Sequence, residues 1–118
     1  MGEPIMAYTA QRCEWAGPDP GKPGPGVMQI FYDGAKPKMI EFLCPCGCGN
    51  TCPTHVVTFA EKDDPDPAKR SVFKDHCWGF DAATLTIRPS IRWTGGCYAH
   101  FHITNGKTEL CSDSGRRP

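Results

Sequence analysis

The sequence predicts a mostly β fold: a small single domain with an antiparallel sheet stapled by zinc, one short helix and an extended N-terminal arm. Thirteen glycines and 12 prolines among 118 residues favour turns and short strands over long helices. The mean hydropathy is negative, so the apolar core must be thin. Eight cysteines offer the metal ligands that such a core needs for stability.

The chain divides into two parts by composition. Residues 1–26 read as an extended arm followed by a Pro- and Gly-rich connector, which excludes helix or central strand. Residues 27–118 carry the strand-like runs and form the predicted zinc-binding β domain. A free arm of this kind would be disordered, so we expect it to contact a protein partner in a larger assembly.

Short runs of β-branched and aromatic residues predict the strands. The runs are Val27–Tyr32, Lys38–Leu43, His55–Phe59, Trp78–Phe80, Thr84–Arg88, Ile91–Trp93, Tyr98–Thr104 and Lys107–Cys111. Asn105-Gly106 is the residue pair that a two-residue type I′ hairpin prefers. The resulting register pairs Phe101 with Leu110 and places Cys111 beside His100.

A single helix is expected over residues 67–75. Asp66 is a good N-cap, and Pro67 suits the first helical position because its missing amide would have no partner there. We therefore expect one short helix between the strands His55–Phe59 and Trp78–Phe80.

Two clusters of metal-ligand residues lie far apart in the chain, and their candidate ligands are Cys44, Cys46, Cys48, Cys97 and His100. Zinc takes four sulfur or nitrogen donors in a tetrahedron, and a tight turn directs two thiols at one ion. Gly47 and Gly49 provide the backbone freedom for that turn. We therefore expect one Zn²⁺ to join the clusters and to organise the strands around it.

Five candidates compete for four positions. The favoured set is Cys46, Cys48, Cys97 and His100, with Cys44 as the alternative to one of the first two. The alternative to a metal site is that the thiols are simply buried or form disulfides, and the absence of a signal peptide argues against this. A weaker second set, which a second zinc would need, consists of Cys13, Cys52, His55, His76, Cys77 and Cys111. Cys111 is either a further ligand or a neighbour of His100.

Charge and hydropathy limit the partners. The 13 basic and 13 acidic residues balance, so a nucleic-acid surface is possible but not favoured. No apolar run approaches the roughly 18 residues that cross a membrane. The N-terminus lacks a basic region followed by an apolar run, so we expect no secretion by a signal peptide and a place in the virion or the host cytoplasm.

The combination of Cys44-Pro45-Cys46-Gly47-Cys48-Gly49, Pro89-Ser90-Ile91 and Cys97-x2-His100 resembles a Cys/His-rich domain-of-unknown-function family of phage and bacterial proteins. The resemblance covers about residues 27–114. It implies a metal-binding β-rich fold and phage ancestry. For some relatives it implies a place beside bacterial ubiquitin-like conjugation genes.

Three functions are compatible with these patterns. The favoured one is a non-enzymatic, zinc-stabilised structural or interaction module, a phage protein docked on an assembly such as the virion. A zinc-ribbon-like nucleic-acid-binding or regulatory factor is the alternative, and an accessory role in ubiquitin-like conjugation ranks lower. Catalysis ranks lowest, because a zinc-bound His100 could not serve as a base for Cys111 and no complete constellation is evident.

Overall fold

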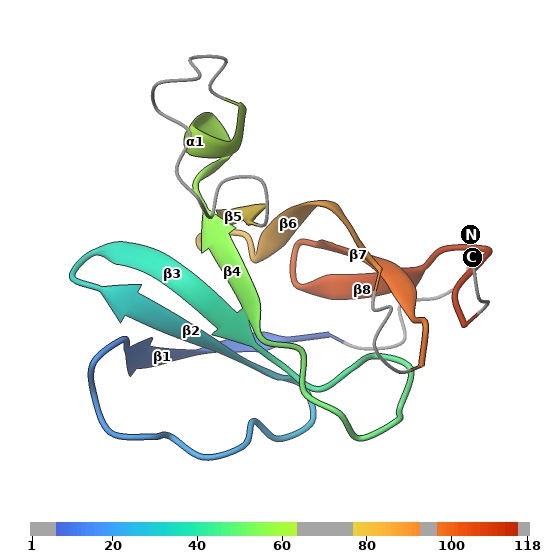
Figure 1. The fold of residues 1–118 in the computed structure, drawn as a ribbon, viewed down its shortest axis with the longest axis horizontal. Coiled ribbons are helices and arrows are strands. Elements are labelled where there is room, and N and C mark those ends of the chain that lie inside the picture. The colour runs from blue at the N-terminus through green and yellow to red at the C-terminus, as the bar shows by residue number, and fades with distance from the viewer. Residues whose placement is uncertain (1–6, 64–76, 93–96, 116–118) are drawn as a thin grey trace.

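The described part of the chain forms a single curled sheet of eight strands, whose spatial order is their order in the sequence (Figure 1). The computed structural model describes residues 7–63, 77–92 and 97–115. The elements are β1 (Thr9–Glu14), β2 (Val27–Asp33), β3 (Lys36–Glu41), β4 (Thr54–Val57), α1 (Phe59–Asp63), β5 (Trp78–Asp81), β6 (Thr86–Arg92), β7 (His100–Thr104) and β8 (Lys107–Leu110).

Most neighbouring strands are antiparallel. The connections of β2 to β3 and of β7 to β8 are tight turns that permit only this arrangement. Two pairs, β1–β2 and β4–β5, are parallel instead. The connector makes the first parallel pair possible, because it carries the chain from the end of β1 back to the start of β2. The side-chain amide of the buried Gln29 holds the connector in place by donating to the Gly21 carbonyl, with nitrogen and oxygen 3.0 Å apart.

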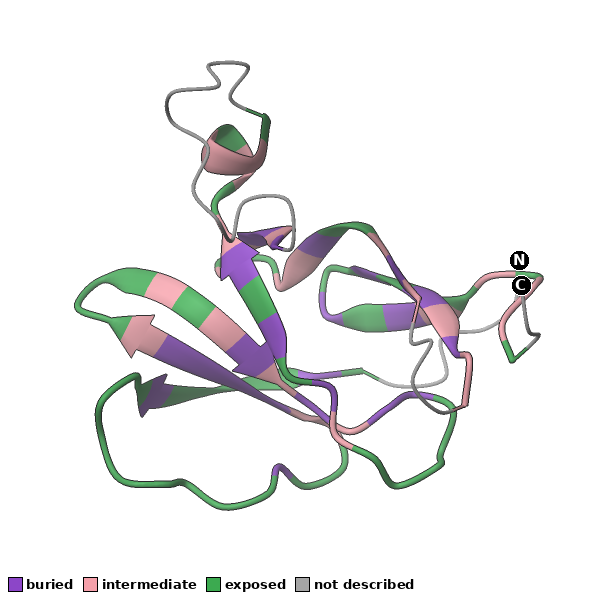
Figure 2. Ribbon diagram, viewed as in Figure 1, coloured by how far each residue is buried: buried purple, intermediate pink, exposed green. Residues whose placement is uncertain are grey.

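The core is formed by the buried residues of the sheet (Figure 2). Buried and exposed positions alternate along β4 and β7, whereas β2 has four buried residues in a row. Phe42 and Phe101, both fully buried, meet edge to face with ring centroids 6.1 Å apart. Tyr8 packs on the other side of Phe42 at 5.3 Å. This aromatic row crosses the core from the first strand's entry to the strand that carries His100.

The two ends of the sheet meet at Tyr8. Its backbone amide donates to the Gly106 carbonyl at 2.7 Å, and the neighbouring residue Ala7 forms an isolated antiparallel bridge with Lys107. The Tyr8 hydroxyl donates to the Leu43 carbonyl at 2.9 Å. The segment predicted as an arm thus contributes a strand and a core residue to the fold.

The predicted mostly β class is confirmed: the described residues form a small sheet domain with one short helix. The hairpin register is also confirmed, since Phe101 pairs with Leu110. Two predicted strands, Thr84–Arg88 and Ile91–Trp93, prove to be parts of one strand, β6, which begins at Thr86 and has a register shift between Ile87 and Ile91. Residue 93 lies outside the described residues. The described helix, α1, begins after Thr58, whereas the helix predicted over 67–75 lies outside the described residues. No helix of the described residues is long and apolar enough to cross a membrane.

Candidate active site and metal centre

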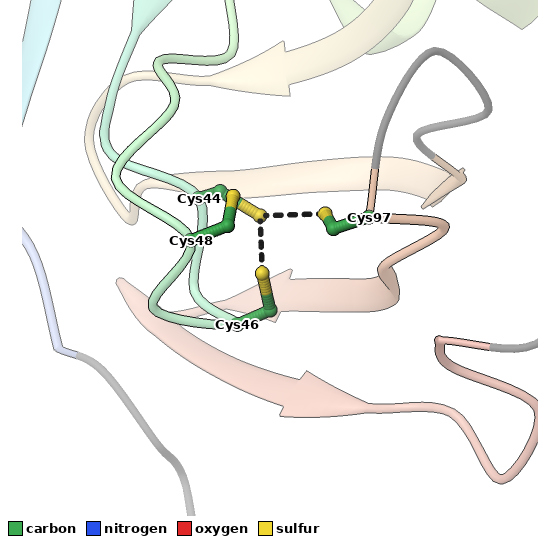
Figure 3. A group of neighbouring side chains, drawn as sticks. All are labelled: Cys44, Cys46, Cys48 and Cys97. Carbon is green, nitrogen blue, oxygen red and sulfur yellow. Dashed lines mark hydrogen bonds between the residues drawn. The ribbon is translucent and has the colours of Figure 1, made fainter.

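Four thiols converge where the cysteine-rich turn faces the start of β7 (Figure 3). The sulfurs of Cys44, Cys46, Cys48 and Cys97 all lie within 4.8 Å of one another. Cys44 is central, because its sulfur is 3.3 Å from that of Cys46 and 3.5 Å from that of Cys97. Four soft donors this close together could hold one metal ion.

The turn that presents three of these thiols is built from the backbone. The Cys44 amide donates to the Asn50 carbonyl at 2.8 Å, and the Gly47 amide donates to the Cys44 carbonyl at 3.2 Å. Gly47 and Gly49 both have left-handed backbone angles, with φ of 87° and 84°. Residues with a side chain rarely adopt these angles, so the glycines allow the chain to reverse direction between thiols.

The thiols differ in acidity. Burial raises the pKa of Cys44 far above its ordinary value, and that of Cys46 also rises through burial. The backbone amide of Asn50 stabilises the thiolate of Cys48 and lowers its pKa to about 7. Metal binding must therefore displace protons from the thiols of Cys44 and Cys46, whereas Cys48 is the readiest of these three to enter as a thiolate.

The favoured ligand set of Cys46, Cys48, Cys97 and His100 differs from this arrangement. Cys44 completes the thiol group, and His100 lies in another group of side chains. The reason is geometric: Cys97 precedes β7, whereas His100 is its first residue and points across the sheet to β6. The structure therefore gathers four of the five predicted ligands.

His100 links a serine to an aspartate. Its Nε2 is 2.8 Å from the Ser90 hydroxyl oxygen, and its Nδ1 is 2.7 Å from Asp113 Oδ1. A hydroxyl, an imidazole and a carboxylate connected in this order form the arrangement that activates a serine for attack on a carbonyl. Recognition of this arrangement rests on geometry and not on the order of the residues in the chain.

Strands β6 and β7 position the first two members. Arg92 and His100 are cross-strand partners, and Ser90 lies two residues before Arg92 on β6. Side chains two apart share a sheet face, so Ser90, Arg92 and His100 lie together. Ile91 and Phe101, directly opposite each other, point into the core and anchor the two strands. The Trp78 indole donates to the Ser90 carbonyl at 3.2 Å and fixes the serine's backbone.

The turn after β8 positions the third member. The Cys111 amide donates to the His100 carbonyl at 2.8 Å, and the Ser114 amide donates to the Cys111 carbonyl at 3.0 Å. The Ser114 hydroxyl accepts the His100 amide at 3.0 Å. Asp113 is therefore held against the start of β7 even though its side chain is 46% exposed.

Hydrogen bonds from His100, and then from Arg92, hold the pKa of Asp113 below its ordinary value. One Arg92 nitrogen contacts both Asp113 Oδ2 and, at 3.0 Å, His100 Nδ1. An ionised carboxylate only accepts hydrogen bonds, so a proton on Nδ1 bonds to Asp113, whereas a bare Nδ1 would direct its lone pair at the carboxylate. The Arg92 N–H, which is also a donor, then bonds to Asp113 and not to Nδ1. The tautomer with the proton on Nδ1 satisfies Asp113 and leaves the Nε2 lone pair free to accept the Ser90 hydroxyl.

The second predicted set is not gathered into one site among the described residues. Cys13 and Cys77 are buried away from the four thiols, whereas the buried Cys52 lies beside Cys44 without joining its group of possible ligands. His55 lies edge to face with Trp15, with 6.4 Å between ring centroids. His76 lies outside the described residues. Only Cys111 joins a group of possible ligands, with His100 and Asp113.

The sequence patterns missed Ser90 and Asp113. Ser90 belongs to the Pro89-Ser90-Ile91 motif of the resemblance. With His100 interpreted as a zinc ligand, however, the sequence pattern offers no imidazole to accept the proton of the serine. The useful signal is that Ser90 and Arg92 alternate on one strand while His100 begins the next, which brings all three to one face. Nothing local marks Asp113, whose position depends on the turn after the hairpin.

A family model described as "Bacterial ubiquitination-like system serine protease (BubE)" matches residues 16–111. The match includes all four clustered thiols, Ser90 and His100, and it ends two residues before Asp113. No curated protein and no solved structure matches the chain.

This match corrects the predicted function. A non-enzymatic phage module was ranked above a link with ubiquitin-like conjugation, and catalysis was ranked last. The matched family consists of serine proteases of a ubiquitination-like system. The error came from giving His100 to zinc, because a zinc-bound imidazole cannot accept a proton from a serine. The resemblance to a Cys/His-rich bacterial family was sound, whereas phage origin is not supported.

Proposed function

Because the chain belongs to the family of bacterial ubiquitination-like system serine proteases, we propose that it is a serine hydrolase that cleaves peptide or isopeptide bonds in such a system. The observation that carries the proposal is the unbroken connection of Ser90, His100 and Asp113. Ser90 itself is only partly buried on β6, so a protein chain can approach its hydroxyl from solvent.

In the proposed reaction the Ser90 oxygen attacks the substrate carbonyl while His100 Nε2 takes the hydroxyl proton. Asp113 stabilises the imidazolium that forms and keeps the ring in place. His100 then gives the proton to the leaving amine, and an acyl group remains on Ser90. Water, deprotonated by His100, releases the acyl group and restores the hydroxyl. Arg92 acts through Asp113 and is a positioning residue.

We also propose that the four thiols hold one Zn²⁺ with a structural role. Four thiolates complete the tetrahedral shell and leave no position for a catalytic water. The fit rests on the donor chemistry and on the sulfur separations around Cys44. Only two residues separate Cys97 from His100, so a metal on Cys97 would fix the start of β7 and, through it, the imidazole.

The triad is tested with a fluorophosphonate, which forms a covalent bond with an activated serine oxygen. Wild-type protein should be labelled at Ser90, as located by mass spectrometry of its peptides. Ser90→Ala should lose labelling, and His100→Ala should slow it by at least about a thousandfold. Ser112→Ala, which removes an exposed serine next to the site, is the matched control and should be labelled normally. Equal labelling of wild type and Ser90→Ala would overturn the proposal.

A further inference from the structure

Three different metal-ligand side chains meet beside Ser90. The donor atoms of His100, Cys111 and Asp113 all lie within 4.8 Å of one another, and each residue is partly buried. The backbone explains the convergence: the Cys111 amide is bonded to the His100 carbonyl, and the Cys111–Ser114 turn carries Asp113. One thiol, one imidazole and one carboxylate form a three-donor set that zinc accepts, with water as the fourth ligand.

We propose that these three residues form a second, weaker site for a thiophilic divalent cation such as Zn²⁺, and that the bound cation switches off Ser90. The inhibition rests on the proposed serine hydrolase, whereas the metal site stands on its own geometry. Cys111 gives the site its chemical character, because it is a soft donor that the reaction itself does not use.

The inhibition follows from the protons of the imidazole. A cation shared with Asp113 takes His100 Nδ1, the nitrogen that faces this carboxylate at 2.7 Å. Neutral imidazole carries one proton, so a metal on Nδ1 leaves that proton on Nε2. Nε2 then donates to Ser90 and cannot accept its hydroxyl proton. The serine stays protonated, and attack on a carbonyl is prevented.

Arg92 makes this site weaker than the four-thiol site. Its guanidinium contacts both Asp113 and His100 Nδ1, and a cation entering there must displace it. The Arg92 side chain is 28% exposed, so a path to solvent is open for it. Affinity should accordingly rise when Arg92 is replaced by an uncharged side chain of similar length, and Arg92→Met is the suitable variant.

The site is tested by titrating reduced, metal-free protein with Co²⁺, whose absorption reports the number of thiolate ligands. Wild type should bind one equivalent with a four-thiolate spectrum and then a weaker one with a single-thiolate spectrum. Cys111→Ser should weaken the second equivalent by at least about tenfold, since even loss of an outer partner of a metal ligand costs that much. Arg92→Met should strengthen it, and Cys13→Ser, a buried thiol outside both groups, should leave both equivalents intact.

Inhibition is measured as the rate at which the fluorophosphonate labels Ser90 in the presence of Zn²⁺. The labelling rate of each variant with excess Zn²⁺ is compared with the rate of the same variant at one equivalent of zinc. Excess Zn²⁺ should slow Ser90 labelling in wild type and not in Cys111→Ser.

The outcomes separate the metal site from the inhibition. Absence of the second equivalent, or its persistence in Cys111→Ser, would overturn the site. A second equivalent without slower labelling would overturn the inhibition. A second equivalent on a chain whose Ser90 never reacts would support the site and overturn the hydrolase instead. If Cys111→Ser does not fold, Asp113→Asn removes another donor and should weaken the same equivalent.

Discussion

Arg92 and His100 face each other across β6 and β7, and the arginine reaches past the imidazole to the carboxylate that supports it. The aspartate of this triad is not enclosed by the core, since nearly half of its side chain is exposed. A cross-strand guanidinium and the Cys111–Ser114 turn therefore replace burial as the means of holding Asp113 in place.

Replacing Arg92 should damage catalysis without removing any reacting group. Arg92→Met should lower kcat about tenfold to a hundredfold, because small misplacements of a positioned group cost that much, and KM should change little. Arg92→Lys keeps the positive charge but loses the planar guanidinium with its paired N–H donors, so its kcat should lie between those of Arg92→Met and wild type. Steady-state kinetics on an activated ester distinguish this from a structural role, which would lower the amount of folded protein and leave kcat per folded molecule unchanged.

Removing one thiol of the four should cost the domain its metal and much of its stability. Metal-binding free energy is folding free energy in a site of this kind. Cys97→Ser should lose one equivalent of zinc, unfold at a lower temperature and label more slowly at Ser90, because the start of β7 loses its anchor. Cys13→Ser should keep the zinc. Metal analysis and thermal melts provide the measurements, and unchanged zinc content in Cys97→Ser would contradict the assignment.

A reciprocal cap begins α1. The Thr58 hydroxyl accepts the Glu61 amide at 3.1 Å, and the Glu61 carboxylate accepts the Thr58 amide at 3.0 Å. The hydrogen bond from Lys36, with further help from Thr58, lowers the pKa of Glu61. Glu61→Gln should therefore cost at most about 1 kcal/mol, because the carboxylate is well exposed and screened by solvent.

The sign of its pH dependence follows from the lowered pKa. The stabilisation by Glu61 is fully present above the unfolded-chain value of about 4.3 and is lost as the pH falls through the lower folded-state value. Denaturant melts of wild type and Glu61→Gln should differ near neutral pH and converge in acid. A difference that grows on acidification would show the opposite linkage.

Tyr8 should prove part of the core. Tyr8→Phe keeps the ring and leaves the Leu43 carbonyl without the hydroxyl, at a cost of about 1–2 kcal/mol. Tyr8→Ala also empties the space beside Phe42 and should cost about 3–5 kcal/mol. Deletion of residues 1–26 should then destabilise the domain, whereas an arm that only docks on a partner could be removed without effect on urea denaturation.

The strands and the final hairpin could be predicted because their signals are local: alternating apolar residues, and Asn105-Gly106 at the turn. The four-thiol group was largely predictable from spacing. The role of His100 was not, because C-x2-H spacing is also what zinc ligands show, and only the pairing of β6 with β7 decides its neighbour. Asp113 and the pairing of β1 with β2 depend on contacts between distant segments, which no local pattern encodes.

The inward- and outward-facing residues of β7 should differ in how much substitution they tolerate. Phe101 and Ile103 are completely buried, so tolerated substitutions there are limited to those that preserve volume. His102 shares the outer face with His100 and is exposed, which leaves it free to vary without unfolding the domain. A mutant library that varied position 102 and kept both apolar neighbours should therefore keep most of its members folded.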